Sequence, residues 1–269
     1  MTQHLHSSLT RQDNGDLASV ESLIELGRDR RRILVFTGAG MSTESGIPDY
    51  RGPGGVWATQ KPPTEGDFRT NPETRRSYWA ARKERFPELI AKQPNAGHLA
   101  VTRLFEAGLV TCVVTQNIDG LHQVAGVPDE AVVELHGSAR SVRCLDCGRE
   151  WDGLDIQRRQ EAGEDVPDCQ NCGGPLRAAT VLFGEPLPAG AFRRAIAETE
   201  RSDLLLVIGS SLIVQPAAKV PLIAIRRGIP LAIVNLTETP LDNQAAVLVR
   251  APAGQVLPLL SQALIDDLS

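Results

Sequence analysis

The sequence is poor in aromatic residues, which make up 4% of its 269 residues. Its core must therefore be built mainly from Leu, Val, Ile and Ala. It contains no apolar run near the roughly 18 residues that a membrane-spanning helix needs. Its net charge of −5 provides no general basic surface for a phosphate backbone. These absences argue against a membrane partner and against direct binding of nucleic acid.

The first 16 residues are polar and lack the apolar stretch of a secretory signal. Two aspartates in this segment, Asp13 and Asp16, also fit poorly with an acid-poor transit peptide. We interpret residues 1–16 as a flexible leader and expect a cytoplasmic protein.

Short, solidly apolar runs recur along the chain, as is typical of strands buried on both faces of a parallel sheet. They lie at residues 33–36, 110–115, 204–208, 231–234 and 246–249. Helical patterns alternate with them, at about residues 17–27, 96–107 and 216–227. The alternation predicts an α/β fold with a doubly wound, mostly parallel, Rossmann-like sheet.

Two segments interrupt this alternation. A stretch rich in Gly and Pro, at about 46–70, follows the first glycine-rich turn and predicts a mobile loop over a ligand. Residues 138–180 hold four of the five cysteines and indicate an inserted zinc-binding module. The predicted main domain therefore consists of residues 17–137 and 181–269.

The four cysteines of this module form two C-x-x-C pairs, Cys144 with Cys147 and Cys169 with Cys172. Their separation is that of a zinc ribbon, and four unrelated buried cysteines are the alternative. Four thiolates saturate a tetrahedral Zn²⁺, so the predicted zinc is structural. A glycine after each pair lets the backbone turn tightly and donate N–H groups to sulfur. The remaining cysteine, Cys112, lies in an apolar strand and is predicted to be a core residue.

A Gly-Ala-Gly turn at residues 38–40 follows the first predicted strand and suits the close approach of a pyrophosphate to backbone amides. The full dinucleotide fingerprint needs a third glycine where this chain has Thr43. Two prolines and four glycines within residues 45–55 then forbid an uninterrupted helix. We predict that a dinucleotide binds in a non-standard manner, with Asp49 and Arg51 offering opposite charges from a loop over it.

Polar residues also follow three other predicted strands, and the carboxyl ends of parallel strands line the ligand crevice of such sheets. They are Gln116, Asn117, Asp119, the Gly209-Ser210-Ser211 segment and Asn235. Amides and a carboxylate can hold an amide or ribose hydroxyls. For the segment around Asp119 alone, a turn with an Asp cap is the alternative interpretation.

His136 ends another apolar run and precedes a glycine. A lone histidine is more often a satisfied structural residue. The other four histidines lie in the leader, within a predicted helix or just after the polar cluster. His136 is therefore the best-placed general base.

Taken together, these segments resemble the sirtuin family of NAD-dependent protein deacylases. The matching segments are collinear over about residues 20–260 and comprise residues 37–42, 45–51, 115–119, 134–137, both cysteine pairs, 181–185 and 209–212. A further segment, residues 71–82, is similar to the class II branch of the family.

The resemblance implies that acyl-lysine and NAD give free lysine, nicotinamide and O-acyl-ADP-ribose. His136 would take a proton from a ribose hydroxyl, and Asn117 would position the reacting ribose as a second catalytic residue. The NAD-binding residues implied are Gly38, Ala39, Gly40, Ser42, Asp49, Tyr50, Arg51, Gln116, Asn117, Asp119, Gly209, Ser210, Ser211, Asn235 and Ala253.

The resemblance also implies that the partners are proteins carrying acylated lysine. Val181, Leu182, Phe183 and Gly184 would pair as a strand with the substrate backbone. Family members that remove succinyl or malonyl groups carry a Tyr-x-x-Arg pair, and here Trp79 and Arg82 stand at that spacing.

Arg82 can pair with an acyl carboxylate, but the phenol of that pair is missing. Packing is the alternative role for the aromatic residues Tyr78 and Trp79. Three other functions also stay open. A zinc-containing NAD dehydrogenase would produce NADH, and a mono-ADP-ribosyltransferase would label protein from NAD. A non-catalytic reader would bind NAD without turnover.

Overall fold

The structure, a computed structural model, describes residues 13–49, 64–182 and 184–268. Of the predicted leader, residues 1–12 lie outside the described part, and residues 13–16 belong to the first helix, α1 (Asp13–Arg28). Within the described residues, no helix combines the length and apolar character needed to cross a membrane.

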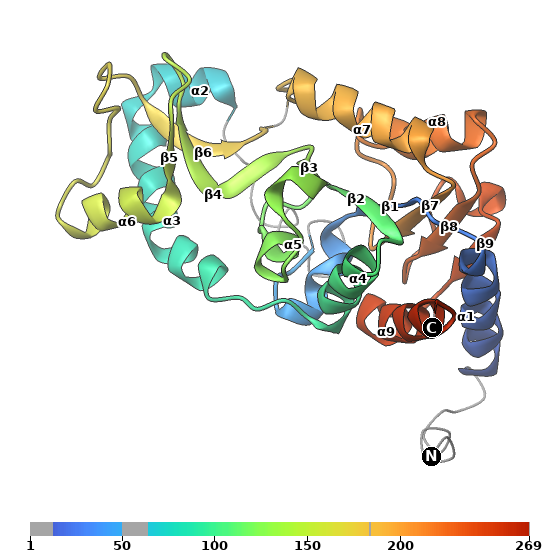
Figure 1. The fold of residues 1–269 in the computed structure, drawn as a ribbon. Helices are drawn as coiled ribbons and strands as arrows, with labels where there is room; N and C mark the ends of the chain where they lie inside the picture. Colours follow the sequence, from blue (N-terminus) through green and yellow to red (C-terminus); the bar gives the residue numbers. More distant parts are fainter. Residues whose placement is uncertain (1–12, 50–63, 183, 269) are drawn as a thin grey trace.

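The larger unit is built on six parallel strands (Figure 1). Their order across the sheet is β3 (Val132–Glu134), β2 (Val110–Thr115), β1 (Ile33–Thr37), β7 (Leu204–Ile208), β8 (Leu231–Val234) and β9 (Val247–Val249). The chain winds outward from β1 to β3 and then returns to add β7 beside β1. The predicted doubly wound parallel sheet is thereby confirmed, with its switch point between β1 and β7.

Helices cover both faces of this sheet (Figure 1). On one face lie α1, α4 (Ala96–Glu106) and α9 (Ala253–Asp266), and on the other lie α7 (Ala189–Arg201) and α8 (Lys219–Arg226). In β1, Ile33 and Val35 belong to the first core, whereas Leu34 and Phe36 belong to the second. Because both faces are covered, residues 33–36 of the strand are all apolar, which explains the solid runs in the sequence.

The ends of two predicted helices illustrate how local bonds set their limits. Helix α4 begins after Asn95, whose side chain accepts hydrogen bonds from the N–H groups of Gly97 and His98. Helix α8 begins at Lys219, three residues later than predicted. Its first residue closes a preceding turn by donating its N–H to the carbonyl of Pro216.

The smaller unit is an antiparallel sheet in the order β5 (Glu150–Asp152), β4 (Gly137–Cys144) and β6 (Leu176–Thr180). Helices α2 (Glu65–Thr70), α3 (Pro72–Ile90) and α6 (Gly153–Glu161) lie beside it (Figure 1). Trp79 of α3 is fully buried in its core with Val142, Ile156 and Leu176. Residues 72–90 therefore complete a core whose other members come from the predicted 138–180 module.

Short helical turns complete the described part of the chain. They are η1 (Ala39–Met41), η2 (Thr43–Ser45), α5 (Leu121–Val124), η4 (Asp129–Ala131) and η5 (Asp242–Gln244). The first two follow β1 directly, so no continuous helix leaves the glycine turn in residues 38–49, as predicted.

Candidate active site and metal centre

The carboxyl ends of β1, β2 and β7 are bonded to one another. Gly38 N–H donates to Ile208 O (3.0 Å), and Gln116 N–H donates to Thr37 O (3.0 Å). The side chain of Gln116 also donates from Nε2 to Ser210 Oγ at 2.8 Å. The polar segments that follow separate strands in the sequence therefore meet at one edge of the sheet.

The glycines after β1 permit an unusually close contact with the turn after β7. A Cβ atom on Gly38 would lie 2.7 Å from the carbonyl oxygen of Gly209, and one on Gly40 would lie 2.8 Å from the Gly209 Cα. Gly40 N–H donates to that same carbonyl (2.8 Å). Gly209 itself has φ of +60°, which favours glycine. Besides the predicted approach to a pyrophosphate, contact between the two turns therefore also requires these glycines.

Ser42, Asn117 and Asp119 form a buried cluster at this edge, with exposed fractions of 1%, 6% and 5%. Ser42 Oγ donates to Asp119 Oδ2 (2.7 Å), and Asn117 Nδ2 donates to Ser42 Oγ (3.1 Å) and to Gly38 O (3.0 Å). Asp119 Oδ1 accepts from Leu121 N–H (2.9 Å) at the start of α5. The carboxylate therefore closes a local turn onto the N–H two residues later, and it is also a member of the polar cluster, whereas the N-cap residue of α5 is Gly120.

His136 lies half-buried on the turn between β3 and β4. Its Nδ1 is 2.9 Å from the carbonyl oxygen of Gln116. A carbonyl can only accept, so Nδ1 carries the proton, and Nε2 of the neutral ring is left as an acceptor. The next residue, Gly137, has φ of +70°, and a Cβ there would lie 2.0 Å from Ala179 O. Only glycine fits at this turn, which fixes the backbone beside the imidazole.

The predicted substrate segment leaves the end of β6 next to His136. Val181 N–H donates to His136 O (2.9 Å), and Leu182 N–H donates to Glu185 Oε2 (2.8 Å). Gly184 is exposed, with φ of +85°. Phe183, the remaining member of this predicted segment, lies outside the described residues.

An ion pair that the sequence interpretation missed supports this segment. Arg177 and Glu185 are bonded at 2.7 Å, and their side chains are only 1% and 12% exposed. Burial alone raises the pKa of Glu185, but Arg177 and the Leu182 N–H together lower this pKa by more, so the net shift is downward. No spacing rule links an arginine on one strand to a glutamate eight residues later, so the sequence held no signal for this pair.

The other predicted cofactor residues occupy the surrounding turns. Ala39 and Ser211 are half-buried after β1 and β7. Asn235 follows β8, where its Nδ2 closes a local turn by donating to Thr237 O (2.7 Å). Ala253 is the buried first residue of α9.

The predicted loop over the ligand is only partly described. Asp49 is half-buried, whereas Tyr50 and Arg51 lie outside the described residues. One member of the preceding turn reaches α9, because Glu44 Oε2 accepts from the N–H of Gly254 at 2.7 Å.

Trp79 and Arg82 lie in the core of the smaller unit. The Arg82 guanidinium stacks over Phe86, with 4.0 Å to the ring centroid, and its Nη2 donates to Ala139 O (3.3 Å). Burial lowers the pKa of Arg82. Trp79 is fully buried, as a packing residue would be. Contact of either residue with an acyl group stays a prediction.

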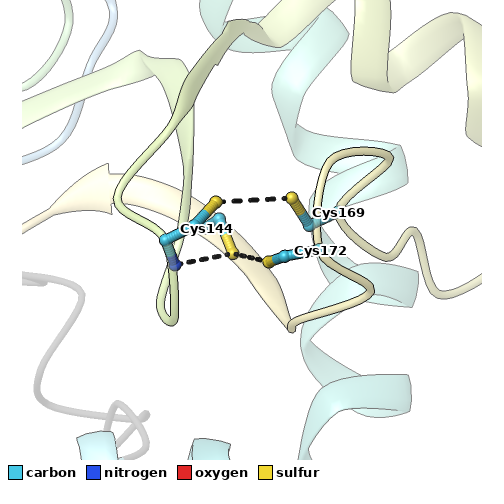
Figure 2. A group of neighbouring side chains, drawn as sticks. Cys144, Cys169 and Cys172 are labelled. Carbon is cyan, nitrogen blue, oxygen red and sulfur yellow. Dashed lines mark hydrogen bonds between the residues drawn. The ribbon is translucent and has the colours of Figure 1, made fainter.

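The four cysteines of the two C-x-x-C pairs converge, with all sulfur atoms within 4.8 Å of one another. Cys144 Sγ lies 3.5 Å from Cys172 Sγ, and Cys147 Sγ lies 3.7 Å from Cys169 Sγ. Zinc–sulfur bonds of about 2.3 Å in a tetrahedron place sulfurs about 3.8 Å apart. The cysteines therefore fit one Zn²⁺ with no open position. Figure 2 shows Cys144, at the end of β4, facing Cys169 and Cys172 from the loop that precedes β6.

Backbone N–H groups surround these sulfurs. Those of Asp146 and Cys147 point to Cys144 Sγ (3.4 and 3.5 Å), and that of Asn171 points to Cys169 Sγ (3.3 Å). Gly148 and Gly173 have φ of +71° and +76°, as the predicted tight turns require. Their own N–H groups donate to the carbonyls of Cys144 and Cys169 instead of to sulfur.

The fifth cysteine, Cys112, is buried in β2 among core residues, and burial raises its pKa to about 12. A thiol held in this way is a poor nucleophile, which confirms its prediction as a core residue.

Residues 38–216 match the model of the Sir2 family. The "NAD-dependent protein deacetylase 2" of Streptomyces coelicolor is 42% identical, over 86% of this chain and 97% of that protein. The "NAD-dependent protein deacylase 2" of Pyrobaculum aerophilum is 41% identical, over 89% of this chain and 93% of that protein.

Solved structures agree with this match. A Sir2 structure with a p53 peptide and NAD⁺ aligns with a TM-score of 0.79 and 37% identity, over 90% of this chain and 97% of that one. A Sir2 structure with a deacetylated p53 peptide and 3'-O-acetyl ADP-ribose aligns with a TM-score of 0.81 and 38% identity, over 90% and 97%. The chain belongs to the Sir2 family.

Proposed function

We propose that this chain removes acyl groups from lysine side chains of proteins in an NAD-dependent reaction that yields nicotinamide and O-acyl-ADP-ribose. One observation carries the proposal. An imidazole whose Nδ1–H is held by a backbone carbonyl stands on the same sheet edge as the buried Ser42–Asn117–Asp119 cluster, because His136 is bonded to the residue that precedes Asn117. Relatives at about 40% identity are named NAD-dependent protein deacetylases.

The cluster has the properties needed to hold a ribose and an amide. When bound, NAD would supply a ribose carbon open to attack and a cationic nicotinamide ring that leaves as neutral nicotinamide. Asn117 and Asp119 orient these groups, and Ser42 holds both side chains in place. Their burial keeps water from the reacting carbon.

His136 supplies the base. Its Nδ1–H is fixed on Gln116 O, which leaves Nε2 to accept a proton from a ribose hydroxyl. The turn that carries His136 also holds Val181, so the base and the substrate segment are joined through one backbone bond.

Acylated proteins are the proposed partners, bound by residues 181–184 as an added strand. Two Sir2 structures similar to this chain hold p53 peptides. Backbone pairing of this kind reads little of the substrate sequence, so the acyl group dominates selectivity. Arg82 and Trp79 remain the candidates for that selectivity.

The decisive experiment offers the zinc-loaded protein a panel of acetyl-, succinyl- and long-chain acyl-lysine peptides with NAD. Mass spectrometry should detect free lysine peptide, nicotinamide and acylated ADP-ribose. Formation of NADH would identify a dehydrogenase instead, and label transferred from NAD to protein would identify an ADP-ribosyltransferase. Binding of NAD without any turnover would leave only a reader.

The variant His136→Ala separates the base from cofactor binding. We expect kcat to fall by about 10²–10⁴, as for removal of a general base, while calorimetry still detects NAD. Glu150→Gln, at an exposed position of β5, is the control and should keep full activity. Full activity in His136→Ala would show that another group is the base.

A further inference from the structure

Two buried histidines lie behind the polar cluster. His98 of α4 and His122 of α5 are 0% and 1% exposed. Their ring centroids are 5.0 Å apart, with the planes tilted by 57°. Among the described residues, His98 Nε2 and His122 Nδ1 are buried without a hydrogen-bond partner. An unmet polar atom at this depth is costly, so two of them on adjacent rings require an explanation.

The neighbours of His98 fix its protonation. Asn95 N–H donates to His98 Nδ1 (3.4 Å) and completes the cap of α4. A nitrogen that accepts carries no proton, so the neutral ring holds its proton on Nε2. Burial lowers the pKa of His98 to about 4, against the opposing effect of Asp119. The unpartnered Nε2 is therefore a donor.

The neighbours of His122 fix its protonation in the same way. Thr37 Oγ1 donates its single proton to Thr115 Oγ1 (2.7 Å). The Thr37 hydroxyl can then only accept from His122 Nε2, which lies 3.1 Å away. Burial and the adjacent His98 lower the pKa of His122 well below its ordinary value. The unpartnered Nδ1 of this neutral ring is therefore an acceptor.

We propose that His98 and His122 are positioning residues, both neutral with the proton on Nε2, and that a hydrogen bond from His98 Nε2 to His122 Nδ1 joins them. The two rings are adjacent, one with an unpartnered donor and the other with an unpartnered acceptor, so a small shift of the rings that forms this bond satisfies both. It closes one chain from Asn95 through the two imidazoles and Thr37 to Thr115.

Both ends of this chain reach the edge of the sheet that carries Ser42, Asn117 and Asp119, which we call the cofactor edge. Thr115 Oγ1 accepts from the N–H of Asn117 (3.0 Å). Asn95 Nδ2 donates to Met41 O (2.8 Å) and to Ser45 Oγ (3.1 Å) in the turns after β1. The chain therefore holds the turn that carries Asn117 in register with the turns that follow Gly40. Its importance for catalysis rests on the proposed function, whereas the protonation pattern does not.

Nitrogen-15 NMR of the full chain tests the pattern directly. Long-range correlation spectra distinguish the two neutral tautomers from the charged ring, and His98→Gln and His122→Gln assign the signals. We expect both rings to be neutral and protonated on Nε2 at about pH 7, where an ordinary histidine is also mostly neutral, and still neutral at about pH 5.5, where an ordinary one is charged. A proton on Nδ1 of either ring, or a charged ring at about pH 5.5, would overturn the proposal.

Kinetics test the positioning role. His98→Leu removes the donor, whereas His98→Gln keeps an N–H donor of similar reach. We expect kcat/KM for NAD to fall about tenfold or more in His98→Leu, with a smaller change in KM for the acyl peptide, and partial recovery in His98→Gln. If His98→Leu and His98→Gln had the same kcat/KM for NAD per folded molecule, this role would be overturned. If the wild type has no deacylase activity, the proposed function fails while the NMR result still decides the tautomers.

Discussion

The two predicted sites of this protein are held together in opposite ways. At the cofactor edge, Ser42, Asn117 and Asp119 bond to one another and to the ends of a sheet whose two faces are both buried. In the smaller unit, two exposed cysteines lie beside two buried ones, and the buried pair belongs to a small core with Trp79, Val142 and their neighbours. The first site inherits its rigidity from a large fold, and the second takes it from a metal ion.

This difference implies different sensitivities. A small apolar core contributes little stability, and a structural metal commonly makes up the deficit. A site made of side chains on a large sheet loses only the bonds of the group that is changed. Loss of the metal should therefore unfold the whole zinc site. A substitution at the cofactor edge should remove only the contacts of the residue that is changed.

Removal of zinc is the largest expected effect. Binding of a structural zinc contributes about 10–16 kcal/mol in isolated zinc domains, so Cys144→Ser should release the metal and unfold the smaller unit. Because residues 181–184 follow β6 of that unit, deacylation should be lost too. Metal analysis and hydrogen exchange would measure both changes.

Cys112→Ala is the matched control, since Cys112 is a buried cysteine outside the two C-x-x-C pairs. It should retain one zinc per chain and lose only the stability of a small core substitution. A folded smaller unit in metal-free Cys144→Ser would contradict the contrast between the two sites.

The parts that sequence reasoning predicted share one property, namely that their signal is local. Strands β2, β7 and β8 have the predicted limits because burial on both faces makes every position of β7 and β8, and most positions of β2, apolar. The zinc centre was predictable because the C-x-x-C spacing by itself places the two thiolates of each cysteine pair at one metal ion. Cys144 and Cys169 could therefore be predicted as zinc ligands without knowledge of the fold.

The parts that could not be predicted depend on contacts across the chain. Ser42 and Asp119 are 77 residues apart and meet only because β1 and β2 are neighbours. Helix α3 carries many charged residues, so the few apolar side chains that it buries, such as Trp79 and Phe86, gave no clear period. His98 and His122 each looked isolated, since their pairing needs α4 and α5 to be placed together.

Glu185→Gln tests whether the substrate segment behaves like the cofactor edge or like the zinc site. The change leaves Arg177, which is 1% exposed, without a counter-charge. Breaking a buried pair from one side costs about 3–5 kcal/mol, and KM for acyl peptides should rise because Leu182 N–H loses its carboxylate acceptor. Urea unfolding and steady-state kinetics would measure the two effects.

The double variant Arg177→Met with Glu185→Leu provides the comparison. Apolar replacement of both partners should restore most of the stability lost in the single variant. If Glu185→Gln alone were as stable as the wild type, the pair would have no structural role.

The buried histidines predict a smaller, pH-dependent effect at the cofactor edge. In the unfolded chain, histidine titrates near pH 6.5, whereas folding lowers the pKa of His98 to about 4. Between these values the unfolded chain binds more protons, so the free energy of unfolding falls as the pH is lowered. Each such histidine contributes a slope of about 1.4 kcal/mol per pH unit.

His98→Gln should reduce that slope by the contribution of about one bound proton, which is about 1.4 kcal/mol per pH unit, between roughly pH 6.5 and 4.5. Urea unfolding of the variant and the wild type at matched pH would measure it, because the carboxylates common to both proteins cancel in the difference. Identical slopes would show that His98 is protonated in the folded state as readily as in the unfolded chain.

The smallest expected effect lies at the exposed junction between α2 and the zinc site. Arg69 donates to Asp146 Oδ1 (3.0 Å) and to Leu145 O (2.8 Å). Both acceptors belong to the turn of the first C-x-x-C pair, residues 144–147, which we call the first knuckle. Its side chain is 39% exposed, so solvent screens the pair, and Arg69→Ala should cost no more than about 1 kcal/mol. The control Arg76→Ala removes an exposed pair with Glu73 within α3.

The two variants should differ in the release of zinc to a chelator. Arg69 is bonded to the peptide that follows Cys144, so its loss frees the knuckle to open, whereas the loss of Arg76 leaves the knuckle unchanged. We expect faster release in Arg69→Ala only, measured with a colorimetric chelator at equal protein stability. Equal rates in the two variants would show that the thiolates alone hold the knuckle, and the contrast between a metal-held and a fold-held site would then be sharper still.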